Sequence, residues 1–180
     1  VERERVEAER AVFEAKAGAD VFVVSPYDES RNYSIAAALE GAASILDAGD
    51  VILIEQQTWA FGNYAPVSAD QAVFDAISLA VAQGIVVVEA GGNGGQDLDG
   101  AQWEGWFDRA ERDSGAIMVG GGASPYSGLT PRTWYSWGSS YGSRVDVQGW
   151  YDSIVTANDS TMADLFLPGG DDHQGYTSYF

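Results

Sequence analysis

The chain has 180 residues, of which 46% are hydrophobic, so we expect one main folded domain with a substantial core. Its 27 acidic against 9 basic residues give a net charge of −18, which argues against nucleic acid and anionic membrane as partners. The absence of cysteine excludes disulfides and thiolate metal sites, and no apolar run approaches the roughly 20 residues that a membrane span needs.

The first seventeen residues differ in character from the rest. Glu alternates there with Arg or Lys around Val6, Phe13 and several alanines, which predicts a charged amphipathic helix. The stretch does not read as a signal peptide, because it lacks an apolar segment before a small-residue cleavage site. We therefore expect two parts: a helix over 1–17, whose membership of the native domain is open, and a main domain over 18–180.

From residue 20 onward, strand and helix patterns alternate. Apolar runs rich in β-branched residues predict strands at 20–25, 51–54 and 85–88. Between them, the sequence predicts helices over 34–48 and 68–82. Strand, helix, strand, helix, strand in this order predicts a parallel sheet with right-handed crossovers.

Local signals mark the ends of these elements. Gly49 and Gly84 follow the two helices, and glycine commonly occupies the position just after a helix. Ser68-Ala-Asp-Gln71 has the form of a capping box, which predicts Ser68 as the cap of the second helix. Two further short strands are predicted at 116–119 and 144–147.

The glycine-rich segment Gly91-Gly-Asn-Gly-Gly95 directly follows the third predicted strand. Glycines there let the backbone turn sharply and let a ligand approach the main chain. In open α/β sheets, ligands bind in the crevice beyond the carboxyl ends of the strands. The amide of Asn93 is a neutral donor suited to an oxygen that gains negative charge, so the sequence predicts a site at Asn93.

Four segments resemble the subtilisin-like serine peptidases (subtilases), and they occur in the order and spacing of that family. The segments are 50–57, 84–94, 114–120 and 139–149, and the resemblance covers about residues 18–180. The resemblance implies an α/β fold of three layers, in which helices flank a mostly parallel central sheet. By comparison with the family pattern, we expect that fold to be incomplete at both ends.

The resemblance also implies roles for individual residues. Asn93 matches the asparagine of the oxyanion hole, whose amide donates to the tetrahedral intermediate. Glu55, Gln56 and Gln57 occupy the place where the family pairs an extended substrate with a backbone edge, although the family more often has Ser-Leu-Gly there.

A third implied element is a wall of the specificity pocket. Ala90, Gly91 and Gly92 match the strip that lines the pocket for the residue before the scissile bond. Small residues at these positions would leave room for a large substrate side chain.

The catalytic triad of the family is missing from these 180 residues. Its Asp and His motifs would precede the strand at 21–24, where there is no histidine, and its Gly-Thr-Ser motif would begin just after Phe180. His173, the single histidine, has no nucleophile turn beside it, so we interpret it as an exposed loop residue. The resemblance implies a secreted serine endopeptidase acting on polypeptides, but we expect this chain alone to be inactive.

Several other interpretations stay open. A non-catalytic α/β module that binds peptides is the alternative to the endopeptidase. A sedolisin-type variant would use a Glu base, but the glutamates of residues 1–17 have no Asp one turn on, and we interpret them as a solvated face. We expect no cofactor; Asp97-Leu-Asp99 is a candidate calcium loop, with a plain solvated turn as its alternative.

Two aromatic clusters and the apolar surface of the sheet lead to two further expectations. The aromatics at 103–107 and 134–137 either pack a core or form a sugar-binding platform. A sheet without the family's outer elements would expose apolar surface, so self-association of the chain is also expected.

Overall fold

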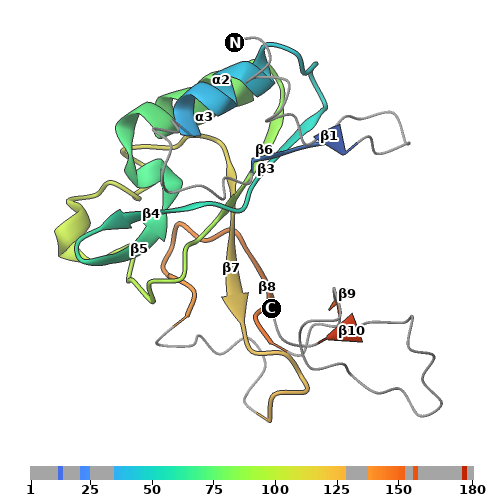
Figure 1. Cartoon of the computed structure of the whole chain (residues 1–180). Helices are drawn as coiled ribbons and strands as arrows, with labels where there is room; N and C mark the ends of the chain where they lie inside the picture. The colour runs from blue at the N-terminus through green and yellow to red at the C-terminus, as the bar shows by residue number, and fades with distance from the viewer. Residues whose placement is uncertain are drawn as a thin grey trace.

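The computed structural model describes residues 35–128 and 138–152 in full, and the backbone of four short strand segments at 12–13, 21–24, 156–157 and 176–177. Within these residues the chain is an α/β fold built on a parallel sheet and two α-helices (Figure 1). The prediction of a parallel α/β sheet is confirmed.

The central sheet has the strand order β1-β2-β3-β6-β7-β8. Strands β3, β6, β7 and β8 run parallel to one another, β2 joins β3 in the same direction, and β1 pairs with β2 antiparallel. The strand bounds are β1 Val12–Phe13, β2 Val21–Val24, β3 Val51–Ile54, β6 Val86–Ala90, β7 Ile117–Gly122 and β8 Val147–Trp150.

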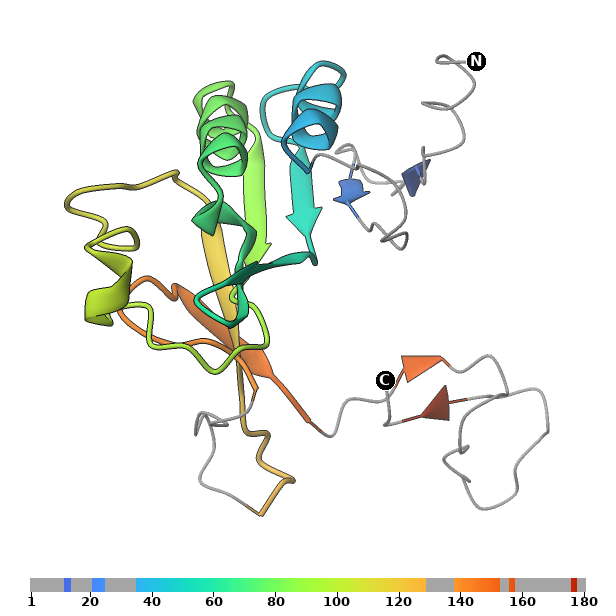
Figure 2. The same ribbon diagram turned by 60° about the vertical axis from the view of Figure 1, so that its left-hand side comes forward.

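Two helices, α2 (Ile35–Ala43) and α3 (Gln71–Ala82), lie side by side over one face of the sheet (Figure 2). Both crossovers, β2-α2-β3 and β3-α3-β6, step across the sheet in the same direction, so the right-handed rule puts both helices on the same face. The core between the layers is formed by fully buried aliphatic side chains, which include Leu39, Ile52, Ile54 and Ile77.

The opposite face of the sheet carries apolar side chains that stay exposed. Side chains alternate along a strand, so Val86, Ile117 and Val147 point away from the helices. Their exposed fractions are 40%, 39% and 50%. Among the residues that the structure describes, one helical layer therefore covers one face of the sheet.

A β-hairpin lies beyond the carboxyl ends of the central strands. It consists of β4 (Gln57–Ala60) and β5 (Asn63–Pro66), joined by the two-residue turn Phe61-Gly62. Both turn residues have positive φ, 52° and 78°, as hairpins with a right-handed twist require.

Short 3-10 helices and a second core support the hairpin. The 3-10 helices are η1 (Val67–Ala69) and η2 (Ala101–Trp103). The second core joins the hairpin to β7 and to the loop around η2, and its buried members are Ala65, Leu98, Trp103, Phe107 and Met118. Two further segments, β9 (Thr156–Ala157) and β10 (Tyr176–Thr177), pair antiparallel.

Some predicted element bounds need correction. Helix α2 ends at Ala43, five residues before the predicted end. Asp70, and not Ser68, caps α3, because its Oδ1 accepts hydrogen bonds from the backbone N–H groups of residues 72 and 73 (2.9 and 3.2 Å). The strand predicted at 144–147 begins only at Val147, because the buried guanidinium of Arg144 holds the preceding turn.

The prediction of a helix over 1–17 is wrong at two positions. Val12 and Phe13 form β1, which pairs antiparallel with β2. Val and Phe both have high β-propensity, and an available sheet edge outweighs weak helical periodicity in a charged segment. The other residues of 1–17 lie outside the part that the structure describes.

No helix in the described part of the chain is both long and apolar enough to cross a membrane.

Candidate functional site

The turn after β6 carries Asn93 to the carboxyl end of the sheet. Hydrogen bonding to β7 continues one residue beyond β6, because the Gly91 N–H donates to the carbonyl oxygen of Val119 (2.8 Å). Gly92 then turns the chain with a φ of +80°, and its carbonyl oxygen accepts from the Ser140 N–H (2.8 Å). Hydrogen bonds to Val119 and Ser140 therefore hold the backbone just before Asn93 in place.

The β4–β5 hairpin packs directly on this turn, so only glycine fits at two of its positions. A Cβ added to Gly92 would lie 2.7 Å from the carbonyl carbon of Ala65. A Cβ on Gly94 would overlap the carbonyl oxygen of Tyr64. The Nδ2 group of Asn63 donates to the carbonyl oxygen of Gly94 (2.8 Å), which fastens the hairpin to the turn.

Asn93 itself is exposed at the tip of this turn. Its backbone N–H donates to Oε1 of Gln57 (2.8 Å), the first residue of β4. Within residues 35–128 and 138–152, its side-chain amide has no hydrogen-bond partner. As far as the described residues show, the geometry therefore offers an unpaired amide donor on a backbone that hydrogen bonds hold in place.

Of the three predicted edge residues, Gln57 is the one whose contact with Asn93 the structure records. Glu55 is exposed and Gln56 is half-buried, and both lie in the connection from β3 to β4. The hydrogen bond from the Asn93 N–H to the Gln57 side chain was not predicted. The clue in the sequence was the long side-chain amide of Gln57, at a position where subtilases more often have glycine. Substrate pairing along 55–57 stays a prediction.

The strip Ala90-Gly91-Gly92 lies at the end of β6. Ala90 is half-buried, and both glycines are buried. A Cβ on Gly91 would come within 3.3 Å of the Val119 carbonyl oxygen. Glycine at this position therefore lets the two backbone segments pack closely. The role of this strip as a wall of a specificity pocket stays a prediction.

Strand β6 carries a buried carboxyl group that the sequence pattern did not predict. Glu89 is 0% exposed, and its Oε1 accepts a hydrogen bond from the Ser68 N–H (2.8 Å). Burial raises the pKa of Glu89, and the bonds from Ser68 and the charge of Arg144 oppose that rise only partly. Its Oε2 has no partner among the described residues. The signal was visible as one charged residue inside the apolar run 85–90.

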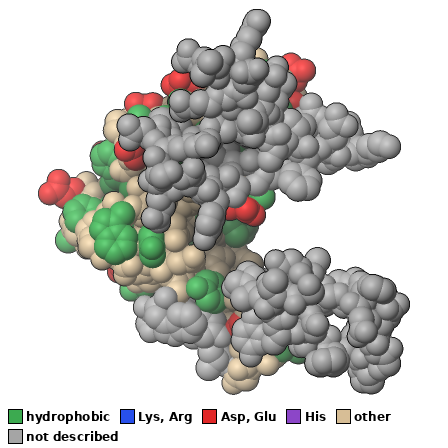
Figure 3. Space-filling model, viewed as in Figure 1, with side chains coloured by type: hydrophobic (Ala, Val, Ile, Leu, Met, Phe, Trp, Pro, Cys, Tyr) green, Lys and Arg blue, Asp and Glu red, His purple; other side chains and the backbone are tan. Residues whose placement is uncertain are grey.

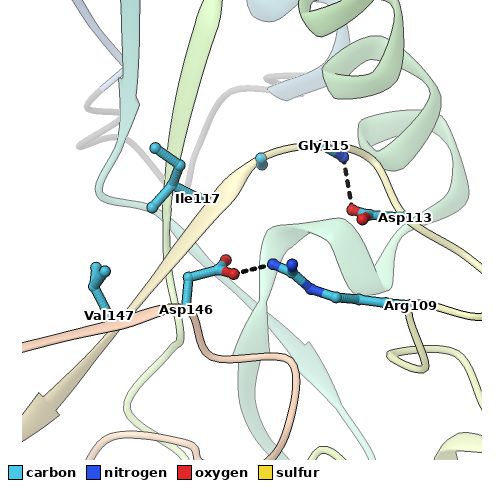
Figure 4. Close-up of a pocket in the computed structure, with 7 residues that line it drawn as sticks. Arg109, Asp113, Gly115, Ile117, Asp146 and Val147 are labelled. Atoms are coloured by element: carbon cyan, nitrogen blue, oxygen red, sulfur yellow. Dashed lines mark hydrogen bonds and ion pairs between the residues drawn. The ribbon is translucent and has the colours of Figure 1, made fainter.

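A cavity of about 330 Å³ lies at the opposite end of the sheet from Asn93, where β7 and β8 begin (Figure 4). Its charged groups already have partners. Asp146 forms ion pairs with Arg109 and Arg144 and accepts from the Met118 N–H (2.7 Å), and Asp113 accepts from the Gly115 N–H (2.8 Å). These groups brace the strands, so the cavity does not contribute to the Asn93 site.

In the candidate calcium loop, Asp97-Leu-Asp99, both carboxylates accept hydrogen bonds from other groups of the protein. The carboxylate of Asp99 accepts from the N–H and the hydroxyl of Ser143 (2.8 and 2.6 Å). Oδ1 of Asp97 accepts from the Asp99 N–H (3.1 Å). Within the described ranges, no three His, Asp or Glu side chains converge in a way that could hold a metal ion.

The first aromatic cluster serves as core. Trp103 and Phe107 are 5% and 3% exposed and contact each other edge to face, with 4.7 Å between ring centres. The sugar-platform interpretation is wrong for these two residues. The second cluster, 134–137, and His173 lie outside the described residues.

Comparison of the chain with protein-family models, with curated protein sequences and with solved structures finds no match.

Proposed function

We propose that this chain supplies the substrate cleft and the oxyanion-stabilising amide of a subtilisin-like serine endopeptidase, a secreted enzyme that hydrolyses polypeptides through an acyl-enzyme. The observation that carries the proposal is the exposed side chain of Asn93, which has no hydrogen-bond partner among the described residues and lies on a turn that hydrogen bonds hold in place. Such a donor lowers the barrier of acyl transfer, because it is already in place where negative charge develops on the carbonyl oxygen.

The position of this amide in the fold supports the proposal. Asn93 follows β6, which is flanked by β3 and β7 in the parallel sheet, so the amide lies at the carboxyl ends of the strands where α/β folds bind ligands. The exposed apolar face of the sheet, opposite α2 and α3, also fits a fold of three layers, in which further elements would cover that face.

The described residues contribute binding and charge stabilisation to this mechanism. They contain no histidine, so they hold no imidazole base for a serine nucleophile. Residues 1–180 alone are therefore expected to bind substrate without hydrolysing it.

The first test uses a fluorophosphonate, which reacts with activated serine. Residues 1–180 alone should take no label, whereas the polypeptide encoded by the whole reading frame should be labelled stoichiometrically and should hydrolyse peptide substrates. If the whole-frame polypeptide binds peptides but takes no label, the endopeptidase proposal is wrong and the non-catalytic peptide-binding module is favoured.

The second test is substitution of Asn93 in the active whole-frame polypeptide. Asn93→Ala should lower kcat about 10²–10³-fold with little change in KM, the loss known for removal of one oxyanion donor in subtilisin itself. Gln83→Ala removes a similar exposed amide beside the end of α3 and should leave both constants unchanged. A kcat of Asn93→Ala within about twofold of the parent would refute the oxyanion role.

A further inference from the structure

We propose that Trp59 and Tyr64 form a subsite for one large apolar side chain of an extended peptide, and that this peptide pairs with the outer edge of β4, the edge that faces away from β5. The peptide class rests on the proposed function, but the subsite is built from other residues than Asn93. It would make the β4–β5 hairpin a determinant of substrate preference.

The two aromatic side chains form an exposed pair on the hairpin. Trp59 is 63% exposed and Tyr64 is 43% exposed, and their rings meet edge to face with centres 5.1 Å apart. Figure 3 shows hydrophobic side chains gathered over the β4–β5 hairpin. Aromatic rings left in water beside a candidate site mark a surface that gains free energy when an apolar group covers it.

The pair lies on the same side of the hairpin as the residue that contacts Asn93. Side chains alternate along a strand, so Gln57 and Trp59 point to the same face, about 7 Å apart along β4. Tyr64 lies directly opposite Trp59 on β5. A peptide whose carbonyl reaches Asn93 would therefore bring a neighbouring side chain within reach of the rings.

The outer edge of β4 has backbone groups available for that peptide. Ala60 and Asn63 close the two-residue turn as a hydrogen-bonded pair, so the next pair along the hairpin, Trp59 and Tyr64, is a non-hydrogen-bonded one. The Tyr64 N–H donates instead to Oδ1 of Asn63 (2.9 Å), and its carbonyl oxygen accepts from Nε2 of Gln96 (2.9 Å). The Trp59 N–H and C=O therefore point to the other edge of β4. In the part of the chain that the structure describes, no strand pairs with that edge.

The hairpin is held firmly enough to present a preformed subsite. Nε2 of Gln96 donates to the carbonyl oxygens of both strands, at Ala60 (3.0 Å) and Tyr64 (2.9 Å). At the tip, the ring of Phe61 contacts the buried ring of Trp103, with 4.8 Å between centres. A rigid aromatic surface loses little entropy when it binds, which favours affinity.

The negative charge of the chain limits which peptides can bind. Glu55 is exposed just before β4, and the whole chain has a net charge of −18. An acidic peptide would be repelled, so the occupant is a neutral or basic extended peptide with one large apolar side chain, aromatic or aliphatic.

The experiment uses residues 1–180 and a set of capped hexapeptides of Ala and Lys, in which a single Phe takes each position in turn. Binding is followed by NMR titration. We expect one Phe position to bind about tenfold tighter than the parent peptide without Phe, and Trp59→Ala and Tyr64→Ala each to remove most of that gain. Trp59→Phe should retain most of it, because a ring remains.

A matched control is available on the same chain. Trp150, at the end of β8, is 51% exposed and contacts Tyr126 edge to face, with 5.8 Å between centres. Trp150→Ala removes another largely exposed indole, outside the hairpin, and should leave peptide affinity unchanged. Thermal melts followed by circular dichroism show that each variant is folded.

Two outcomes would overturn the subsite. One is a Phe preference that survives in Trp59→Ala and Tyr64→Ala. The other is that cello-, xylo- or chito-oligosaccharides shift the Trp59 resonances while no peptide does, which would assign the pair to carbohydrate.

The subsite and the proposed function can fail separately. Asn93→Ala should not change peptide affinity, because its amide acts on the transition state. If Asn93→Ala slows hydrolysis while Trp59→Ala leaves the Phe preference intact, only the subsite is wrong. If Trp59→Ala removes the preference while Asn93→Ala leaves hydrolysis unchanged, only the proposed function is wrong.

Discussion

Glu89 and Asn93 lie four residues apart in the chain, yet their surroundings give them opposite properties. Glu89 lies inside the sheet, where its carboxyl group receives one bond from the Ser68 N–H and burial favours the protonated form. Asn93 lies on the exposed turn, where its amide is unpartnered among the described residues. Residue type alone would suggest the carboxylate as the reactive group, but solvent access makes the amide the better candidate.

The raised pKa of Glu89 predicts how stability changes with pH. The ordinary pKa of this carboxyl group is 4.5, so above that pH the unfolded chain releases a proton that the native state keeps. The free energy of unfolding should therefore be greatest below the ordinary pKa and should fall as the pH rises through the raised one. Glu89→Gln has a side chain that is neutral at every pH, so its free energy of unfolding should depend less on pH than that of the parent.

Urea unfolding of the parent and of Glu89→Gln between pH 4.5 and 8 measures the effect. Glu111→Gln removes an exposed carboxyl group and serves as the control. Equal pH slopes for the parent and Glu89→Gln would show that Glu89 is ionised in both states.

At the scale of elements, the β4–β5 hairpin and the turn after β6 form one unit. Their contact explains the glycines on both sides of Asn93, for which the sequence predicted only sharp turning and close approach of a ligand. Gly92 does turn the chain with positive φ, but Gly94 is needed because the backbone of Tyr64 takes the space of its side chain. A single sequence shows a glycine but not the strand that lies against it, since that strand is some 30 residues away.

Gly94→Ala tests this unit. The added methyl would overlap the Tyr64 carbonyl oxygen and push the hairpin off the turn, so the free energy of unfolding should fall by about 1–3 kcal/mol. Gly41→Ala is the control, because a Cβ there meets no atom within 4 Å and the residue lies in α2, where Ala is favoured by about 0.5–1 kcal/mol. Urea unfolding compares the two, and equal effects would refute close packing at Gly94.

At the scale of the whole molecule, the sheet is covered unequally. Helices α2 and α3 bury one face, whereas Val86 and Ile117 remain 40% and 39% exposed on the other. These two side chains lie on the same face, because Ile117 pairs with Val88 and side chains alternate along β6. Apolar sheet surface of this kind promotes association.

Residues 1–180 should therefore self-associate, with the exposed sheet face as the contact. Val86→Lys and Ile117→Lys should each weaken association about tenfold, because an ammonium group would be buried without a partner. Leu79→Lys is the control, since Leu79 is 53% exposed on α3, on the helical side. Sedimentation velocity over a concentration series measures the effect, and a monodisperse monomer with a sharp thermal melt would contradict it.

Local patterns in the sequence were enough to predict the parallel α/β sheet and to place Asn93 after a central strand. These features depend on local periodicity and on glycine positions, which one chain displays directly. Three other features became visible only in the folded chain: Val12 and Phe13 form a strand, Glu89 is buried, and the Gln57 side chain accepts a hydrogen bond from the Asn93 N–H. Each of these depends on contacts between residues distant in the chain, or on an edge that another strand offers, and a single sequence does not show such partners.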